Sequence, residues 1–512
     1  MVLSVSDQPV LDVAYDTIML GKQALIFTES KLSAEKTAED LARIIRKKQP
    51  RMEEHLALAD KLLKSVGSPT KQCKRLSICV MSGVAFHHAG LVSEQRTLLE
   101  NAFRDGTITT LCATPTLAYG VDTPAYRVIL KSLKRYSGQW GMAWIPVLEY
   151  LQFCGRAGRP KFHDDHGEAI AIAKDDIEHD KIHAQYILGL PEDIASKLAV
   201  EPVLRTHILS LIASCFASSR EQLIHFFSRT FWAHQYKDML QLEKIIDKML
   251  ALLVSWGFLL KNDDDFVSAA DLGKNMLNAT PLGKRVAELY LDPYTAHVML
   301  NGVQKSGRAV PKVFGVLQLI SHTLQMRPLL RLRVKDHEVV QQSLMEHYDE
   351  LLVMEPTIYD PAYDEFLESI KTSMFFEDWM SEHTEEQLLE KHNVRPGEVQ
   401  GKVATADWLL YALGEMLPFV HAHHLITEVK KLRMRMQYGV KEELLTLLRF
   451  DGVGRVRARR LFKHGLIDVP SLKKADVATL ARIVGKATAA KIKEQVGQKS
   501  DAANLITQPF LA

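Results

Sequence analysis

The first 175 residues alternate short, mostly apolar runs with longer amphipathic ones. Four runs have the length and composition of strands buried on both faces, at 23–28, 107–114, 126–132 and 167–173. An amphipathic pattern opens at Ser33 and continues to about residue 47. Strands that alternate with helices are typical of a parallel sheet with crossover helices. We therefore predict an α/β lobe, in which the polar stretch 48–80 is an irregular insertion.

From about residue 200 onward the pattern becomes helical. Apolar side chains recur at helical spacing from Leu242 to Trp256, and Gly257 ends that run. The stretch 258–269 then predicts a small hairpin with an acidic turn, and helices followed by a hairpin indicate a winged-helix module. Residues 290–435 are predicted to be helical throughout, whereas 440–497 are short, basic and turn-rich.

Composition places this chain among ordinary globular proteins. It has 512 residues, 47% hydrophobic residues and a net charge of only +2. The longest apolar run, 249–260, is too short to cross a bilayer, so we expect no membrane contact. The five cysteines lack metal-ligand spacing, which favours a reduced, cytoplasmic protein. The histidine-rich stretches HDDH (163–166) and HAHH (421–424) also lack ligands at zinc spacing, and no metal site is predicted.

Chemistry first becomes visible in the stretch QFCGRAGRP, residues 152–160. It places Arg156 and Arg159 on a glycine-rich turn. Arginine is always charged and binds phosphate oxygens with two parallel hydrogen bonds. A pair at this spacing predicts a grip on a nucleotide phosphate, although a basic surface loop is the alternative.

Three more stretches accompany this one in order. FHHAGL (86–91) and ATPTLAYGVDTPA (113–125) precede it, and QALIFTESKLSAEKTAEDLA (23–42) opens the lobe. Together the four stretches resemble motifs IV, IVa, V and VI of superfamily II helicases. The similarity is strongest to the Ski-type class and, within it, to the archaeal HelQ-type DNA helicases. PVLEYLQFCGRAGRP and ATPLGKRVAELYLDP (279–293) carry much of that likeness.

The resemblance implies a division of roles around ATP. Arg156 and Arg159 would be arginine fingers, and Gln152 would orient the γ-phosphate or the attacking water. The residues that would couple the nucleotide to the grip on DNA are Gly120, Asp122 and Gly155. The family often has asparagine at position 122, so this chain departs from the pattern there.

The resemblance also implies contacts with DNA. His87, His88 and Thr114 would contact the backbone of the single strand, although both histidines could equally be structural. The segment 133–146 lies where the family carries a strand-separating hairpin. Its aromatic side chains Tyr136, Trp140 and Trp144 would stack on the base pair being opened, or alternatively pack within the lobe.

A phosphate cradle is missing from the sequence. Helicases of this type bind ATP between two RecA-like lobes, and the first lobe brings GxxxxGK[ST] and a DExH box. No Gly-Lys pair here is followed by Ser or Thr, and no Asp-Glu-x-His occurs. We therefore expect ATP and Mg²⁺ to be bound mainly by a first lobe from a separate polypeptide, and this chain alone to be inactive.

The stretch 396–413 resembles the central helix of the family's ratchet domain. Trp408 would stack on a base of the translocating strand, or alternatively pack in the core. The family tends to carry an arginine one heptad earlier, where this chain has Gly401 followed by Lys402. The predicted phosphate contact from Lys402 is correspondingly less certain by resemblance.

The stretch 447–465 has the pattern of a helix-hairpin-helix. Gly452 and Gly454 would form a tight turn whose amides meet a phosphate. Four arginines follow at once, at Arg455, Arg457, Arg459 and Arg460. Residues 440–499 hold 14 Lys and Arg against 6 Asp and Glu, an excess of eight positive charges. This balance predicts DNA binding that does not depend on sequence, with a basic solvated face as the alternative, and 483–497 resembles a partial second copy.

These inferences combine into one prediction. The fold is an α/β RecA-like lobe (1–190) followed by a winged helix (191–289), a helical ratchet bundle (290–438), a helix-hairpin-helix domain (439–499) and a flexible tail (500–512). By resemblance the chain is the C-terminal part of an ATP-dependent 3′→5′ helicase, nucleoid-associated, acting on single-stranded and forked DNA. The rival hypotheses are a non-catalytic DNA-binding or regulatory module and a Ski-type RNA helicase.

Overall fold

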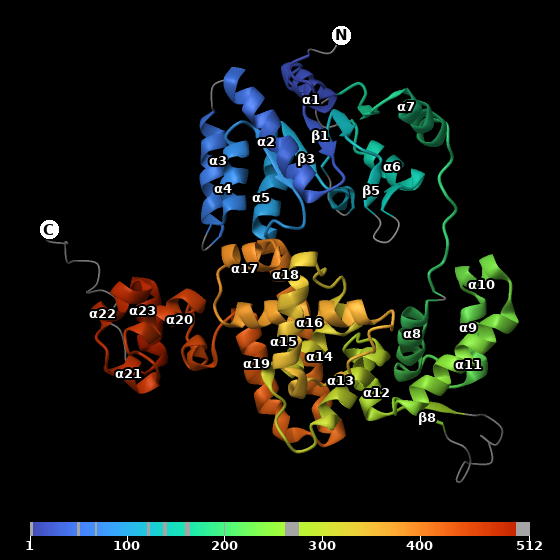
Figure 1. Cartoon of the computed structure of the whole chain (residues 1–512), viewed down its shortest axis with the longest axis vertical. Coiled ribbons are helices and arrows are strands. Elements are labelled where there is room, and N and C mark those ends of the chain that lie inside the picture. The colour runs from blue at the N-terminus through green and yellow to red at the C-terminus, as the bar shows by residue number, and fades with distance from the viewer. Residues whose placement is uncertain are drawn as a thin grey trace. The chain divides into compact units, whose positions relative to one another are not determined.

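A computed structural model describes most of the chain, and it divides into two compact units. The first unit comprises Met1–Ile194 and Glu385–Gln400, and the second comprises Ala195–Thr384 and Gly401–Ala512 (Figure 1). The residues described are 4–48, 52–66, 69–119, 123–136, 141–158, 164–198, 200–261 and 276–497.

A five-stranded parallel sheet forms the centre of the first unit. Its order is β2-β3-β1-β4-β7, and its members are β1 (Ala24–Phe27), β2 (Val84–His87), β3 (Thr110–Ala113), β4 (Arg127–Leu130) and β7 (Glu168–Ala171). The predicted parallel sheet is confirmed, and each of the four predicted strands is present. The edge strand β2, with the sequence VAFH, was not among the predicted strands.

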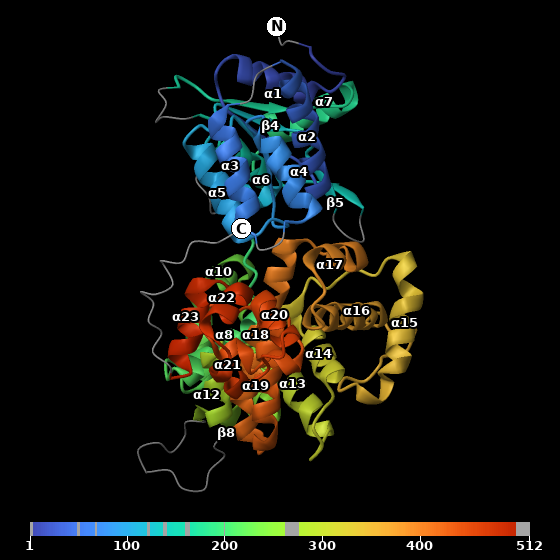
Figure 2. The ribbon, with the colours of Figure 1, turned by 90° about the vertical axis from the view of Figure 1, so that its left-hand side faces the viewer.

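Helices cover the sheet on both sides. They are α1 (Pro9–Met19), α2 (Lys31–Lys48), α3 (Glu53–Lys64), α4 (Lys71–Val80), α5 (Ser93–Arg104), α6 (Val147–Cys154) and α7 (Asp176–Ile182). Helices α2 and α4 pack against β2, while α1 packs against β1 and β4 (Figure 2).

The prediction of an irregular insertion at 48–80 was wrong. Most of this stretch is helical, because α3 and α4 pack on each other and bury Leu62, Leu76 and Val80 completely. Each helix is short, with 12 residues in α3 and 10 in α4, so its apolar stripe spans only about three turns and is easily overlooked.

The second unit opens with a group of helices and one hairpin. The helices are α8 (Glu201–Ala213), α9 (Arg220–Ser228), α10 (Phe231–Tyr236) and α11 (Met239–Ser255). Gly257 follows α11 with a φ of +74°, as the predicted helix end requires. Strand β8 (Leu259–Lys261) pairs antiparallel with β9 (Leu277–Ala279), so the second strand of the hairpin lies beyond the predicted 258–269. The predicted acidic turn falls outside the described residues.

The next part of the chain is largely helical, as predicted. It contains α12 (Pro281–Glu288), α13 (Pro293–Lys305), α14 (Val313–Ser321), α15 (His337–Glu346), α16 (Tyr363–Met380), α17 (Glu385–His392), α18 (Pro396–Met416) and α19 (Ile426–Tyr438). Helix α14 packs on α16 around Phe314, Phe366 and Ile370. Helix α18 begins in the first unit and continues in the second.

One helical stretch among the described residues is long and apolar enough to cross a membrane. It is Pro396–Val420, with a mean hydropathy of 1.2. Length and composition alone are weak evidence, because core helices of globular proteins meet the same criteria. Here Leu409, Leu410 and Leu413 are wholly buried in the protein.

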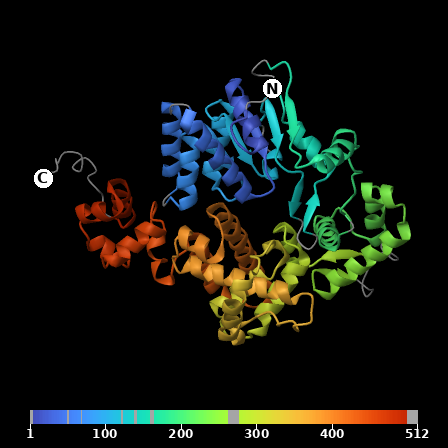
Figure 3. The same ribbon diagram turned by 45° about the horizontal axis from the view of Figure 1, so that its top comes forward.

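The last four helices form a cluster of their own (Figure 3). They are α20 (Arg455–Lys463), α21 (Val469–Lys474), α22 (Val477–Val484) and α23 (Lys486–Gln495). Leu447, Leu461, Leu480 and Ile492 are buried at its centre. The two glycine turns, at Gly452 and Gly485, both have positive φ. This repetition agrees with the predicted second copy of the hairpin.

Candidate functional site

Helix α6 presents the predicted phosphate-reading residues at its C-terminal end. Its buried side carries Phe153, which stacks on Phe27 of β1 with ring centroids 4.4 Å apart. This packing turns the opposite side outward, where Leu151 and Gln152 are exposed. Gly155 caps the helix with its amide bonded to Leu151 O. The side chain of Gln152 is therefore open to solvent, and its contact with a nucleotide stays a prediction.

Backbone hydrogen bonds to Ala125 hold the turn that follows α6. The amide of Ala125 donates to Arg156 O (2.9 Å), and the amide of Gly158 donates to Ala125 O (2.7 Å). Gly158 has a φ of +98°, a region that glycine adopts without strain. A Cβ on Gly167 would overlap the backbone of Gly158. Gly158 therefore serves the turn through its positive φ, and Gly167 allows the close approach of the two chain segments.

Arg156 joins two of the predicted motifs. Its guanidinium donates to Ala118 O, the last residue of the 3₁₀ turn Pro115–Ala118. The stretches 113–125 and 152–160 therefore meet through this side chain, which is half-buried. The other residues predicted here, Arg159, Gly120 and Asp122, lie outside the described residues.

The two predicted DNA-contacting histidines are both buried. His87 is 4% exposed, and its Nε2 lies 2.9 Å from Glu100 Oε1. That hydrogen bond is the main reason that the pKa of Glu100 is lowered. His88 is wholly buried and lies 3.2 Å from Glu35 Oε1. This burial favours the structural alternative for both rings, and a direct contact with DNA stays a prediction.

Burial and charge oppose each other at His88 and Glu35. Burial lowers the pKa of His88, against the pull of the Glu35 carboxylate. Burial would raise the pKa of Glu35, but the hydrogen bond from His88 and the charges of Arg395 and Arg75 outweigh it and lower the pKa to about 2. The pair is therefore a neutral imidazole beside an ionised carboxylate at neutral pH.

Thr114 lies at the carboxyl end of β3, beside the end of β2. Its amide donates to His87 O (3.2 Å), and its hydroxyl lies 3.1 Å from that of Thr116. Thr114 is 9% exposed. Ligands of parallel sheets bind at this edge, so the position agrees with the predicted role while the hydroxyl itself is engaged within the protein.

A β-hairpin stands where the resemblance implied one. Strand β5 (Lys134–Tyr136) pairs antiparallel with β6 (Met142–Trp144). Tyr136 is 59% exposed at the end of β5. Trp144 is half-buried, with the ammonium groups of Lys134 and Lys181 within 4.8 Å of its ring centroid. These contacts favour the packing alternative for Trp144, and Trp140 lies outside the described residues.

The predicted phosphate contact from Lys402 is weakened by the structure. Its ammonium donates to the backbone carbonyls of Met326 (2.6 Å) and Pro328. This lysine therefore ties α18 to the segment before α15, and its charge is already engaged. Trp408, two turns further along α18, is half-buried, which is compatible with either of its two predicted roles.

The four arginines of the C-terminal hairpin divide into two kinds. Arg455 donates to His383 O and lies 4.9 Å from the ring centroid of Trp379. Arg459 pairs with Glu382 and with Glu443 (2.7 Å). These contacts hold the hairpin to the end of α16, so both guanidinium groups are engaged within the protein, and their contact with DNA stays a prediction.

The other two hairpin arginines face solvent. Arg457 and Arg460 are exposed on α20, and Arg457 donates to Gly452 O (2.7 Å). Gly452 has a φ of +79°, and Gly454 is the N-cap residue of α20. The turn and these two charges together form a surface suited to a phosphate backbone. Among the described residues there is no cluster of three metal-binding side chains.

Comparison with known proteins agrees with this geometry. Residues 67–161 match the family described as "Helicase conserved C-terminal domain". Residues 314–439 match "Archaeal helicase, domain 4", and 444–497 match "SAM-like Helix-hairpin-helix tandem".

Three relatives that match nearly the whole chain bear the same name. The chain is similar to the "ATP-dependent DNA helicase Hel308" of Methanocella arvoryzae, with 37% identity over 95% of this chain and 64% of the relative. The protein of that name from Pyrococcus abyssi is 37% identical over 95% of this chain and 65% of its own length. The one from Methanococcus vannielii is 33% identical over 97% and 69%.

The chain belongs to the Hel308 family of DNA helicases. It spans about two thirds of the length of these curated relatives. Membership confirms the predicted helicase resemblance in its coarser form, together with the parallel sheet and the helix-hairpin-helix. The strands and turns that place Gln152 and Arg156 are therefore those of a Hel308 helicase domain.

One charged cluster, formed by Glu35 and Arg395, was not predicted from the sequence of this Hel308-family chain. Glu35 and Arg395 meet in the first unit (3.2 Å) although 360 residues separate them. Glu35 is 1% exposed and lies within the stretch 23–42 that helped to carry the resemblance. A glutamate on the apolar face of a helix was the available signal, since buried carboxylates need charged partners.

Proposed function

We propose that the chain is the part of an ATP-dependent DNA helicase that reads the γ-phosphate from the second RecA-like lobe and grips single-stranded DNA. The observation that carries this proposal is the bond from Arg156 to Ala118 O, beside the exposed Gln152. It brings the two motifs of the resemblance together at one site. A basic surface loop would not need the glycine contacts that hold this turn.

ATP with Mg²⁺ would supply the phosphoryl group whose transfer to water drives movement. In this chain Arg156 would place positive charge beside the γ-phosphate as negative charge develops there. Gln152 would orient that phosphate or the attacking water. The residues present fit this second-lobe part, and the phosphate loop and Mg²⁺-binding carboxylates are assigned to a first lobe.

The DNA path is assigned to the family's domains. Movement in the 3′→5′ direction and opening of forked or branched duplexes follow from the resemblance. The β5–β6 hairpin would separate strands, with Tyr136 against the opened pair. Residues 191–289 would form the winged helix, and 290–438 the ratchet bundle with Trp408 on the strand. We also propose a cytoplasmic, nucleoid-associated location.

DNA-stimulated ATP hydrolysis tests this proposal. The chain is assayed alone and then mixed with a polypeptide that carries a phosphate loop and a DExH box. Activity that needs both components and is lost in Arg156→Ala supports the proposal. The matched control is Arg43→Ala, an exposed arginine of α2 paired with Asp40 (2.9 Å), which should behave as wild type.

Two outcomes would overturn it. DNA binding without hydrolysis in any mixture would favour the non-catalytic module. Tighter binding to single-stranded RNA than to DNA at the same salt concentration would favour a Ski-type RNA helicase. Both comparisons need a fixed ionic strength, because affinity for a polyanion falls steeply with salt.

A further inference from the structure

A late segment of the chain completes the RecA-like lobe. Residues 385–400, which comprise α17 and the first turn of α18, belong to the same compact unit as the sheet. Leu388, Val394 and Val399 are buried there. At its rim, Lys71 pairs with Glu386 and Glu390, but exposed pairs of this kind stabilise little. The specific contact lies deeper.

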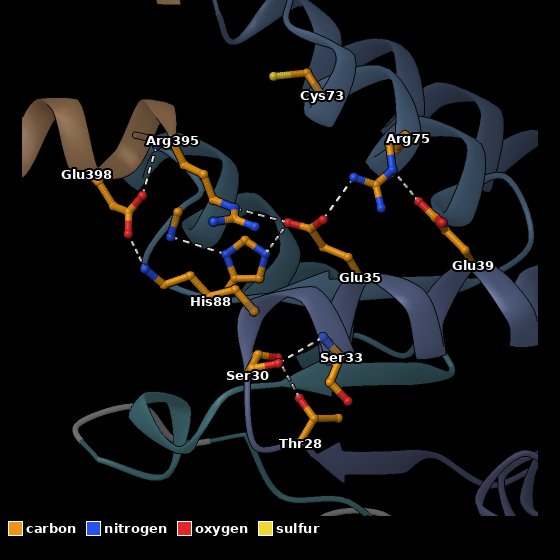
Figure 4. Close-up of polar contacts among 12 residues, drawn as sticks. Thr28, Ser30, Ser33, Glu35, Glu39, Cys73, Arg75, His88, Arg395 and Glu398 are labelled. Atoms are coloured by element: carbon orange, nitrogen blue, oxygen red, sulfur yellow. Dashed lines mark hydrogen bonds and ion pairs between the residues drawn. The ribbon is translucent and has the colours of Figure 1, made fainter. Parts of the chain in front are cut away.

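At the centre of this contact one carboxylate takes three partners. Glu35 Oε1 lies 3.2 Å from both Arg395 Nε and His88 Nε2, and its Oε2 lies 2.8 Å from Arg75 Nη1. Figure 4 shows the three groups converging on Glu35 from three different segments. Arg395 is itself largely buried, with 13% of its side chain exposed. Removing either partner from a buried ion pair of this kind strongly lowers the stability of the protein, because the remaining charge stays buried without a partner.

The imidazole of His88 carries this contact into the loop 88–91. Its Nδ1 accepts the amide hydrogen of Gly90 (3.1 Å). Nε2 therefore bears the ring proton and donates it toward Glu35. The ring is fixed in one tautomer and one orientation, and the conformation of the loop depends on the Glu35 carboxylate through it.

The backbones of the two segments also touch directly. The amide of Gly397 donates to Gly90 O (3.0 Å). A Cβ on Gly397 would overlap the carbonyl oxygens of Ala89 and Leu91, and one on Gly90 would overlap Cδ of Arg395. At both positions a larger residue would therefore collide with the facing segment. The carboxylate of Glu398 accepts from the Arg395 amide (2.8 Å) and pairs with Lys31, which fixes the start of α18.

The loop held in this way lies at the ligand-binding edge of the sheet. It follows β2 directly, and the amide of Thr114 at the end of β3 bonds to His87 O. Ala89 is the exposed residue of the loop. The side of the loop at Ala89 is therefore open to solvent, at the edge where the proposed function places the single strand.

We propose that Arg395 is a positioning residue for the DNA grip: through Glu35 and His88 it holds the loop 88–91 in the shape that receives the single strand. The inference rests on the proposed function and adds to it a residue outside all the helicase motifs. Arg395 does not touch DNA in this scheme. It acts on the strand only through the loop.

The test uses the whole 512-residue chain and Arg395→Met, which keeps the apolar stem beside Gly90 and removes the charge. Arg395→Lys is the conservative rescue, and Arg43→Met is the matched control on the exposed face of α2. Hydrogen exchange is measured on peptides that cover 86–92. Affinity for a fluorescein-labelled oligothymidylate is measured by anisotropy at fixed salt.

We expect Arg395→Met to speed amide exchange at 86–92 and to weaken DNA binding at least about fivefold, with lysine restoring both. A purely structural role would instead lower the fraction of active protein and leave the dissociation constant unchanged. An unchanged dissociation constant in Arg395→Met overturns the inference while wild-type binding upholds the proposed function. A wild-type chain that does not bind the oligonucleotide overturns the proposed function and this inference with it.

Discussion

The RecA-like lobe and the C-terminal hairpin domain treat their motif residues in opposite ways. In the lobe, His87, His88 and Thr114 are buried and bonded to the protein. In the hairpin domain, Arg457 and Arg460 are exposed. The lobe therefore engages these three motif side chains within the protein, whereas the hairpin domain leaves two of its four motif arginines on the surface. A sequence motif can therefore locate a binding region without identifying the atoms that contact the ligand.

The largest effect that separates the two regions is expected in catalysis. Arg156→Ala should lower the ATPase rate of the complete helicase by about a thousandfold, because an arginine finger contributes on that scale. Its affinity for DNA should stay unchanged. ATPase assays at saturating DNA, with anisotropy in parallel, measure both. A loss of DNA affinity equal to the loss of rate would place Arg156 in the DNA grip.

The next effect concerns the stability of the lobe. Glu35→Gln should lower the free energy of unfolding at pH 7 by about 3 kcal/mol, because the carboxylate is buried among three donors. The pKa of Glu35 is lowered from 4.5 to about 2. Its contribution is therefore complete above pH 4.5 and is lost as the pH falls toward 2.

Denaturant titrations of wild type and Glu35→Gln along this pH range test that sign. The difference between the two proteins should shrink as the pH falls. Glu443→Gln is the control from the hairpin domain, a half-exposed carboxylate that pairs with Arg459, and it should cost under about 1 kcal/mol. A difference that grows toward low pH would contradict the assignment of Glu35 as ionised.

A smaller effect distinguishes the arginines within the hairpin domain. Replacing Arg457 and Arg460 by alanine should weaken DNA binding about tenfold and reduce the salt dependence by about two phosphate contacts. Arg459→Ala should lower the thermal midpoint instead, because it leaves Glu382 without its partner. Anisotropy across a salt series and a melting curve measure these effects. If DNA affinity depended equally on salt in both variants, the distinction between DNA-binding and structural arginines would be wrong.

A last comparison uses one glycine from each region. Gly454→Ala should cost under about 1 kcal/mol, because a Cβ there meets open space and only the helix cap is weakened. Gly397→Ala should cost about 1–3 kcal/mol, since its Cβ would overlap two carbonyl oxygens of the loop 88–91. Thermal unfolding compares the two. A similar cost at both sites would mean that the lobe accommodates the overlap.

Local sequence patterns predicted the strands of the lobe and the glycine turns of the hairpin domain. Both features depend on the types of a few neighbouring residues. The patterns failed at 48–80, where each helix is too short to show a clear stripe. They also failed at Arg395, because its partner Glu35 is distant in the sequence and neither residue is unusual by itself. For His87 and His88, the sequence left open whether the rings contact DNA or have a structural role. Their burial in the structure favours the structural role.

The position of residues 385–400 has a practical consequence for dividing this protein. A fragment that stops at residue 194 would keep every strand of the sheet and every motif described for the lobe. It would nevertheless leave Glu35 without one of its cations and uncover the backbone of Gly90. No single cut of the chain separates the lobe intact from the rest. A self-sufficient version would need residues 385–400 joined back through a linker.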